Sequence, residues 1–213
     1  MIVTSAPETQ HRVLLQNIRW ETYEALLKDF EEQPTVRLTY DRGLLEIMTP
    51  LDPHEGNKKI IGRFVETLTE ELEIEIRSLG SRTCRRRDLL RGLEPDQCYY
   101  ITNESVVRGV RQIDLDRYPP PDLVIEIDIT SSSIDRMALY ITLGIPEVWR
   151  YDGNAIAFYR LQNGQYQTCE TSVIFPFVRS EDILQFLNRS GTMGENRLIR
   201  SFREWVRERS QGF

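Results

Sequence analysis

A strictly alternating segment in the middle of the chain, residues 122–130, constrains the fold more than any other feature. Its aliphatic residues fall on one face of an extended strand: Leu123, Ile125, Ile127 and Ile129. The other face carries Val124 and three acids, Asp122, Glu126 and Asp128. Because the segment is rich in Val and Ile, it predicts a strand inside a sheet, where like charges about 7 Å apart repel one another. A cation or water would offset that repulsion, so the acidic face is a candidate site; the alternative is an ordinary solvated face.

The composition fits a soluble globular protein with one core. The chain has 213 residues, 40% of them hydrophobic, and no apolar run approaches the roughly 20 residues of a membrane span. We therefore expect a single domain over residues 1–213 and no membrane partner. The N-terminus lacks a basic region followed by an apolar block, and the three cysteines form no disulfide or zinc pattern, which predicts a cytoplasmic protein. The net charge of −6 does not decide whether the protein binds nucleic acid.

The N-terminal third predicts a helix, a hairpin and a second helix. Apolar residues recur at helical spacing over residues 20–30. Two alternating segments then flank turn residues 41–43, which predicts a β-hairpin with Glu46 pointing away from its apolar face. Asp52-Pro53 marks the start of a helix that ends before Ile74.

The rest of the chain predicts a mixed sheet. Its elements are strands within 74–86 and 97–101, a polar loop over 103–118, the alternating strand, a helix over 134–143, strands at 147–151, 156–161 and 166–169, and helices at 181–187 and 196–209. Ser131–Ser133 are expected to cap the 134–143 helix and Gly144 to end it. A strand–helix–strand unit of this length implies a parallel, right-handed crossover. We expect an α/β (α+β) fold: a mixed β-sheet flanked by helices, with a core over about residues 20–170 and a C-terminal helical appendage over about 180–213.

Two of the predicted strands begin with Pro-Asp, and the order of elements places them side by side. Asp96 begins one, Asp122 begins the other, and Glu126 lies further along the second. Asp122 and Glu126 are about 13 Å apart on that strand, too far to share one ion, so Asp96 is the first choice as the partner of Glu126. Converging carboxylates hold Mg²⁺ or Mn²⁺ against a phosphate. His54, one helical turn before Lys58, is a candidate to orient water or phosphate; an incidental histidine is the alternative.

A basic cluster follows the strand that ends near Gly80. It consists of Arg82, Arg85, Arg86, Arg87 and Arg91. Phosphate contacts need local positive charge in a chain that is otherwise acidic, so we expect Arg85, Arg86 and Arg87 to contact nucleic acid. A solvated, arginine-rich edge is the alternative.

Three segments together resemble a known family, the bacterial restriction-endonuclease-like proteins of the Uma-two type, which belong to the PD-(D/E)XK nuclease superfamily. They are residues 43–50 followed by His54-Glu55, residues 121–126, and Tyr140 with residues 144–149. The resemblance covers about residues 20–169 and implies a restriction-endonuclease-like mixed sheet flanked by helices. It also implies that an acid from a Pro-Asp strand, Asp96 or Asp122, holds Mg²⁺ together with Glu126.

One position departs from the superfamily pattern. The lysine expected two residues after the second acid is Asp128 here, and the helix position to which some relatives move that lysine is Arg136. Arginine stabilises the charge of a phosphate group but stays protonated, so it is a poor general base. We expect Arg136 to supply the electrostatic part of the lysine's task without being needed for folding. We also expect Glu126→Gln to relieve repulsion and leave the fold at least as stable.

Two functions follow from these residues. The favoured one is a metal-dependent endonuclease that uses Mg²⁺ or Mn²⁺ to hydrolyse phosphodiester bonds of its partner, DNA. The alternative is a catalytically degenerate protein of the same fold that binds nucleic acid or acts as a scaffold. A small-molecule enzyme is disfavoured because the chain has no nucleophile motif or phosphate-binding glycine loop. The sequence leaves a homodimer open.

Overall fold

The computed structural model describes residues 12–31, 33, 36–49, 52–128 and 132–212, without the side chains of residues 52–54. The helices are α1 (Trp20–Asp29), α2 (Asp52–Glu71), α3 (Glu104–Val107), α4 (Arg136–Leu143), α5 (Ser180–Asn188) and α6 (Glu195–Ser210). The strands are β1 (Arg12–Leu15), β2 (Arg37–Asp41), β3 (Leu44–Met48), β4 (Arg77–Gly80), β5 (Cys84–Arg86), β6 (Arg91–Leu93), β7 (Gln97–Tyr100), β8 (Leu123–Ile127), β9 (Glu147–Tyr151), β10 (Ile156–Gln162) and β11 (Gln165–Cys169).

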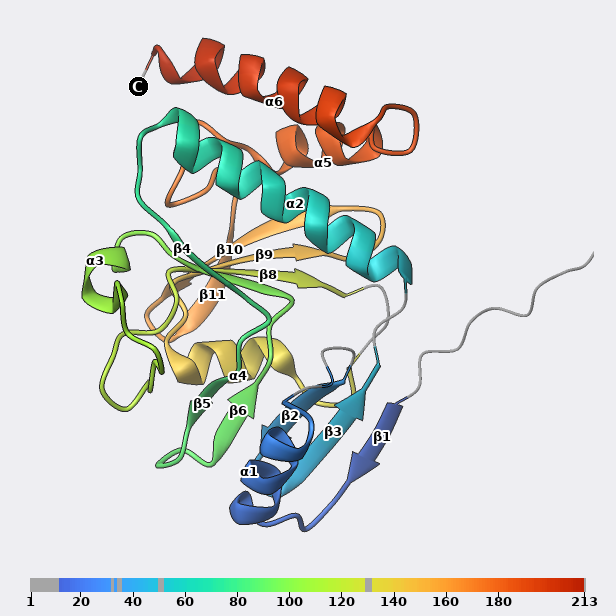
Figure 1. Cartoon of the computed structure of the whole chain (residues 1–213), viewed down its shortest axis with the longest axis vertical. Coiled ribbons are helices and arrows are strands. Elements are labelled where there is room, and N and C mark those ends of the chain that lie inside the picture. The colour runs from blue at the N-terminus through green and yellow to red at the C-terminus, as the bar shows by residue number, and fades with distance from the viewer. Residues whose placement is uncertain (1–11, 32, 34–35, 50–51, 129–131, 213) are drawn as a thin grey trace, which may run out of the picture.

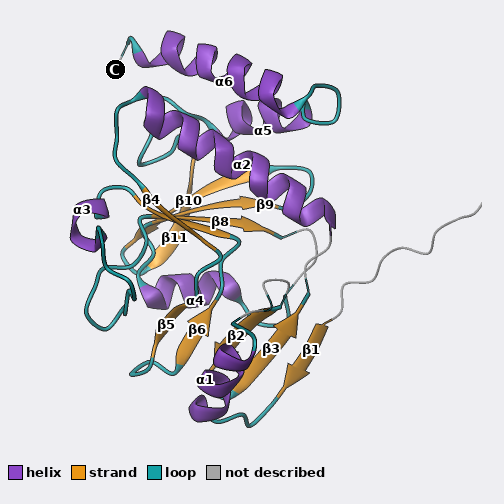
Figure 2. Cartoon of the chain, viewed as in Figure 1, coloured by secondary structure: helices purple, strands orange, loops and turns teal. Residues whose placement is uncertain are grey.

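The strands form two sheets (Figures 1 and 2). The large sheet has the order β11-β10-β9-β8-β7-β4 and is mixed, because β8 runs parallel to β9 while the other neighbours are antiparallel. The small sheet is antiparallel, with the order β1-β3-β2-β6-β5. The chain leaves the small sheet for β4, returns for β5 and β6, and crosses again at β7. The predicted mixed sheet and parallel crossover are confirmed, and the predicted hairpin belongs to the second sheet.

Helix α4 lies between the two sheets and packs on both (Figure 1). Its residues Leu139, Tyr140 and Leu143 share a core cluster with Val124 and Val148 of the large sheet and with Cys84 and Leu93 of the small sheet. The helix begins later than the predicted serine caps, because the side chain of Asp135 accepts a hydrogen bond from the backbone N–H of Ala138 (3.1 Å). Gly144, with a φ of 76°, ends it in the left-handed conformation, as predicted.

Helices α2, α5 and α6 cover the opposite face of the large sheet (Figure 1). The apolar face of β8 points into this core through Leu123, Ile125 and Ile127, as the alternation predicts; Ile129 lies outside the described residues. The two C-terminal helices form where they were expected. They are packed into the main core, because their apolar stripes, which include Phe186 and Phe202, meet α2 and the sheet.

Three short elements are not predicted from the sequence. β1 and β6 complete the small sheet, and α3 lies within the segment that was expected to be a loop. In β6, a Cβ atom at Gly92 would lie 2.4 Å from the hydroxyl oxygen of Tyr23 in α1, so only glycine lets the helix approach the sheet this closely. No helix in the described part of the chain is long and apolar enough to cross a membrane.

A buried acid, Glu147, attaches the segment before α5 to the large sheet. Glu147 is the first residue of β9 and is 1% exposed. One carboxylate oxygen accepts a hydrogen bond from the indole N–H of Trp149 (2.7 Å), and the other accepts from the backbone N–H groups of Val173 (3.0 Å) and Ile174 (3.1 Å). Burial raises the pKa of Glu147, and these donors only partly oppose the shift.

The raised pKa of Glu147 predicts a pH dependence of stability. The folded state holds this proton more tightly than the unfolded state, so the free energy of unfolding falls as pH rises from the ordinary value of 4.5 through the raised pKa. We expect Glu147→Gln to make this decline shallower, measured by urea unfolding at a series of pH values. Glu170→Gln, at an exposed residue, is the control. An unchanged slope in Glu147→Gln would show that Glu147 does not titrate in this range.

Candidate functional site

Two of the predicted acids meet on neighbouring strands. Asp96 directly precedes β7, which pairs antiparallel with β8, and this places it beside Glu126. Both residues are buried, with 3% and 5% of their surfaces exposed. The carboxylate oxygen Oδ2 of Asp96 accepts a hydrogen bond from the backbone N–H of Ile127 (2.7 Å), the residue after Glu126. The strand order therefore brings these two carboxylates together, as the sequence predicts.

Asp122, the other acid of a Pro-Asp pair, has a different environment. It lies at the opposite end of β8 and binds the turn that follows β7. Its carboxylate accepts hydrogen bonds from the backbone N–H groups of Ile101 (2.7 Å) and Asn103 (2.9 Å) and from the side-chain amide of Asn103 (2.6 Å). These contacts give Asp122 a structural role in the turn, so we do not retain it as a metal ligand.

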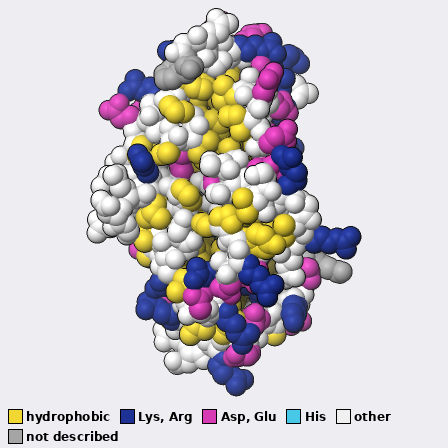
Figure 3. Space-filling model, turned by 90° about the vertical axis from the view of Figure 1, so that its left-hand side faces the viewer, with side chains coloured by type: hydrophobic (Ala, Val, Ile, Leu, Met, Phe, Trp, Pro, Cys, Tyr) yellow, Lys and Arg dark blue, Asp and Glu magenta, His cyan; other side chains and the backbone are white. Residues whose placement is uncertain are grey.

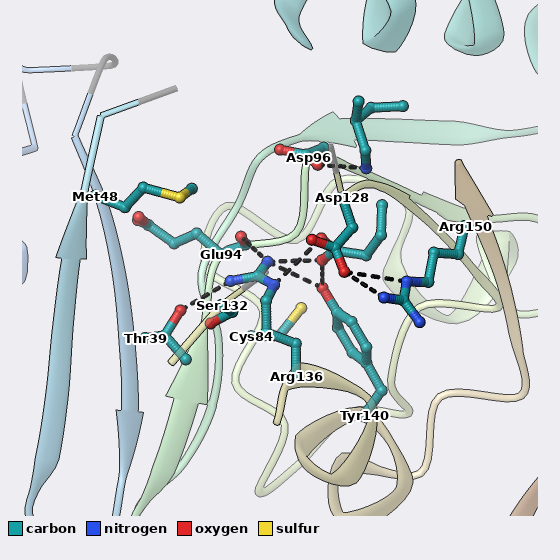
Figure 4. Close-up of polar contacts among 12 residues, drawn as sticks. Thr39, Met48, Cys84, Glu94, Asp96, Asp128, Ser132, Arg136, Tyr140 and Arg150 are labelled. Carbon is teal, nitrogen blue, oxygen red and sulfur yellow. Dashed lines mark hydrogen bonds and ion pairs between the residues drawn. The ribbon is translucent and has the colours of Figure 1, made fainter. Parts of the chain in front are cut away.

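Arg136 engages both carboxylate oxygens of Glu126. Figure 4 shows its guanidinium between Thr39 and Tyr140. Its Nη2 donates to Oε1 at 2.6 Å and its Nε donates to Oε2 at 3.2 Å. The Tyr140 hydroxyl, one turn further along α4, also donates to Oε1. The guanidinium continues to the small sheet, where Nη1 donates to the hydroxyl of Thr39 (2.8 Å), and Nη2 also donates to the carbonyl of Glu94 (2.8 Å). Arg136 is thus held by partners from both sheets and from its own helix.

Burial controls the ionisation of this network. Burial raises the pKa of Glu126, the positive charge of Arg136 opposes the shift, and the negative charge of Asp96 adds to it. Burial also raises the pKa of Tyr140, and the neighbouring Glu126 charge raises it further, so the phenol stays protonated and donates to the carboxylate. Burial alone would lower the pKa of Arg136, but the charge of Glu126 more than offsets this and the guanidinium stays charged.

A cavity of about 170 Å³ opens beside Glu126. It is lined by Glu126, Asp128, Ser132, Ile134, Asp135, Arg136, Met137 and Arg150. Asp128, in the position where the superfamily carries its lysine, forms an ion pair with Arg150 of β9, whose Nε lies 3.1 Å from Oδ2 of Asp128. The cavity therefore contains three carboxylates and two guanidinium groups among its described residues.

Glu46 of β3 is buried and holds the loop that borders the cavity. Its carboxylate accepts hydrogen bonds from the hydroxyl of Ser132 (2.7 Å) and from the backbone N–H of Ser133 (2.7 Å). The alternation of the hairpin correctly predicts that Glu46 points away from the apolar residues, but no local pattern connects it to a loop 86 residues further along the chain. The sequence could have indicated Tyr140 as a site residue, because it lies four residues after Arg136 and therefore on the same face of a helix.

The remaining predicted residues lie elsewhere or outside the description. His54 belongs to the first turn of α2, but its side chain lies outside the described residues, so its role stays a prediction. Arg85, Arg86 and Arg87 each have an acidic partner: Arg85 pairs with Glu24, Arg86 with Asp88 and Asp116, and Arg87 with Glu21 and Glu24. Figure 3 shows basic and acidic side chains interleaved at the lower end of the molecule. Contact of the cluster with nucleic acid also stays a prediction.

The acids at the site fit a hard divalent cation in their chemistry. No three His, Cys, Asp or Glu side chains of the described residues form a ready-made metal cluster. Mg²⁺ needs only one or two carboxylates, however, because it keeps several waters and takes oxygen ligands from a substrate phosphate. Asp96 and Glu126 supply such a pair, and the cation would compete with Arg136 for Glu126.

The burial of this ion pair reverses two expectations drawn from the sequence. Arg136→Ala leaves the Glu126 charge buried without its partner, and Glu126→Gln does the same to the Arg136 charge. We therefore expect each substitution to destabilise the protein, by about 3–5 kcal/mol for Arg136→Ala. In the variant that carries both substitutions, the loss of unfolding free energy should be smaller than the sum of the two single losses by about 0.5–3 kcal/mol, measured by urea unfolding.

The exposed pair Arg179 and Glu170 provides the control cycle, where we expect a coupling near zero. Additive losses at Glu126 and Arg136 would mean that the two side chains act independently in the folded protein.

Comparisons with known proteins agree with this architecture. Residues 20–192 match the family Uma2, described as "Putative restriction endonuclease". A crystal structure of a "putative nuclease belonging to DUF820" from Anabaena variabilis ATCC 29413 is similar in fold, with a TM-score of 0.52 and 17% identity, over 76% of this chain and 98% of that chain. No curated protein matches the sequence. Because the family match spans most of the chain, the protein belongs to the Uma2 family and has its restriction-endonuclease-like nuclease fold.

Proposed function

We propose that the protein is a metal-dependent endonuclease that hydrolyses phosphodiester bonds of DNA at the cavity beside Glu126. The observation that carries the proposal is that two buried carboxylates, Asp96 and Glu126, lie side by side at neighbouring strands, and that Glu126 lines a polar cavity. Membership of a family of restriction-endonuclease-like proteins supports a nucleic-acid substrate. The homodimer that the sequence left open stays a prediction.

The charge of the cavity supports the dependence on a metal. Its three carboxylates and two guanidinium groups leave one net negative charge among the described lining residues. A phosphodiester adds a second negative charge, which would be repelled in a partly buried site. A divalent cation offsets these negative charges, so the cation and the phosphate favour each other's binding.

The residues of the chain divide the work as follows. Asp96 and Glu126 would hold Mg²⁺ or Mn²⁺, which when bound polarises the phosphate and lowers the pKa of a bound water. Tyr140 and Arg136 fix the orientation of the Glu126 carboxylate through hydrogen bonds. Arg136 stays protonated and cannot serve as a general base, so it acts through its charge.

A specific observation favours the alternative, a catalytically degenerate protein that binds nucleic acid. Arg136 engages both oxygens of Glu126, and Asp128 replaces the superfamily lysine, so a cation must compete with a guanidinium for its ligand. The two functions differ in their dependence on the metal: the endonuclease cleaves DNA only with a divalent cation, and the degenerate protein binds DNA and cleaves nothing.

A plasmid assay tests the endonuclease. We expect supercoiled DNA to be converted to nicked or linear forms with Mg²⁺ or Mn²⁺ and to stay intact in EDTA. Asp96→Asn should abolish cleavage, because it removes one carboxylate while keeping the side-chain shape, and circular dichroism checks that the variant folds. Glu170→Gln, at an exposed acid outside the cavity, should cleave like the wild type. Absence of cleavage by the folded wild type with either metal would favour the degenerate protein.

A binding assay tests the charge argument independently of cleavage. We expect Ca²⁺, used to limit turnover, to strengthen binding of a labelled DNA duplex by the wild type, measured by fluorescence anisotropy. The same ion should have a smaller effect on Asp96→Asn, which lacks one ligand. Binding that is equally tight in EDTA and in Ca²⁺ would show that the cavity does not need a cation to accept a phosphate.

A further inference from the structure

Two arginines border the cavity, and their surroundings differ. The side chain of Arg136 is 14% exposed and donates to Glu126, Thr39 and the Glu94 carbonyl. The side chain of Arg150 is 38% exposed, and its ion pair with Asp128 uses a single carboxylate oxygen, Oδ2. Turning the Arg136 guanidinium toward a ligand would break buried bonds, whereas Arg150 can exchange a partly solvated one.

We propose that Arg150 is the residue that contacts the phosphate of the nucleic acid, and that Asp128 holds its guanidinium until the phosphate takes the place of the carboxylate. This inference rests on the proposed function, since it concerns the substrate of the same cavity. In this arrangement Arg136 is a positioning residue that acts through Glu126, and Arg150 is the residue that binds the substrate.

The sheet register places Arg150 correctly for this role. β8 and β9 are parallel, and Glu126 is the partner of Arg150 in the register, so both side chains leave the sheet on the same face. Asp128 follows two residues later on that face. Figure 4 shows the Arg150 guanidinium directed at Asp128 from the side opposite to Arg136. A positive charge thus reaches the cavity from the neighbouring strand, beside the position where the superfamily pattern has its lysine.

The chemistry of the exchange favours a phosphate over a carboxylate once a cation is present. A guanidinium offers parallel N–H donors that match two phosphate oxygens. The ion pair that must open is partly solvated and is therefore screened and weak. Asp128 then acts as a competitor of the substrate, so removing its charge should strengthen DNA binding only if Arg150 is present to use the vacated donors.

Anisotropy titrations of a labelled DNA duplex in Ca²⁺, at several salt concentrations, test this inference. We expect Arg150→Ala to weaken binding and to reduce the slope of log K against log [salt] by about one, the loss of one phosphate contact. Arg150→Lys should keep the slope, because it keeps the charge. Arg160→Ala, an exposed arginine on the adjacent strand β10 that does not line the cavity, should leave affinity and slope unchanged.

Asp128→Asn is tested in the wild type and in Arg150→Ala. The comparison shows whether any gain in DNA binding comes from the freed Arg150 guanidinium or only from the loss of a negative charge. We expect tighter binding in the wild-type background and no gain in Arg150→Ala. Melting curves confirm that each variant is folded. An unchanged slope in Arg150→Ala, or an Asp128→Asn gain that persists without Arg150, would overturn the inference. Because these experiments measure binding, they are decided separately from the plasmid assay, which tests whether the proposed endonuclease cleaves.

Discussion

A buried ion pair between Glu126 of β8 and Arg136 of α4 joins the main parts of the structure. Through Arg136 the large sheet is connected to Thr39 in the small sheet and to the carbonyl of Glu94 just before β7. Replacing such a pair with apolar residues often costs nothing, but removing one partner leaves a buried charge that is expensive. The pair therefore requires α4 to lie in one position between the sheets, whatever its net contribution to stability.

The same pair governs what the cavity can do. Arg136 orients Glu126 and offsets its charge, while a second pair, Asp128 with Arg150, lies nearer the solvent. Coulomb interactions weaken as the effective dielectric constant rises, so the two pairs differ in how readily they exchange partners although their groups are alike. The buried pair fixes geometry. The partly solvated pair is the one that we propose opens for a ligand.

Periodicity and strand order predict the large sheet and the meeting of Asp96 with Glu126, because both follow from local pattern and from the order of the elements along the chain. The small sheet is only partly predictable: β1 and β6 have four and three residues, too few to show a period. Sequence reasoning also treats the acidic face of β8 as repulsive. The family resemblance places Arg136 at the site, but the alternation does not show that it forms a buried ion pair with Glu126, and the sign of the expected Glu126→Gln effect changes for this reason. The connection of Glu46 to Ser132 is equally hidden, since nothing local relates a hairpin to a distant loop.

The path of the chain between the two sheets has a consequence for folding. The small sheet takes its strands from residues 12–48 and 84–93, with α2 and β4 of the other layer between them. Its central strand β2 pairs with β3 early in the chain but receives its other neighbour, β6, only after α2 and β4 have been passed. These long-range pairings raise the contact order, which slows folding. An amino-terminal fragment ending before β5 would leave one edge of β2 open and α4 absent, so the two sheets are expected to form in one cooperative step.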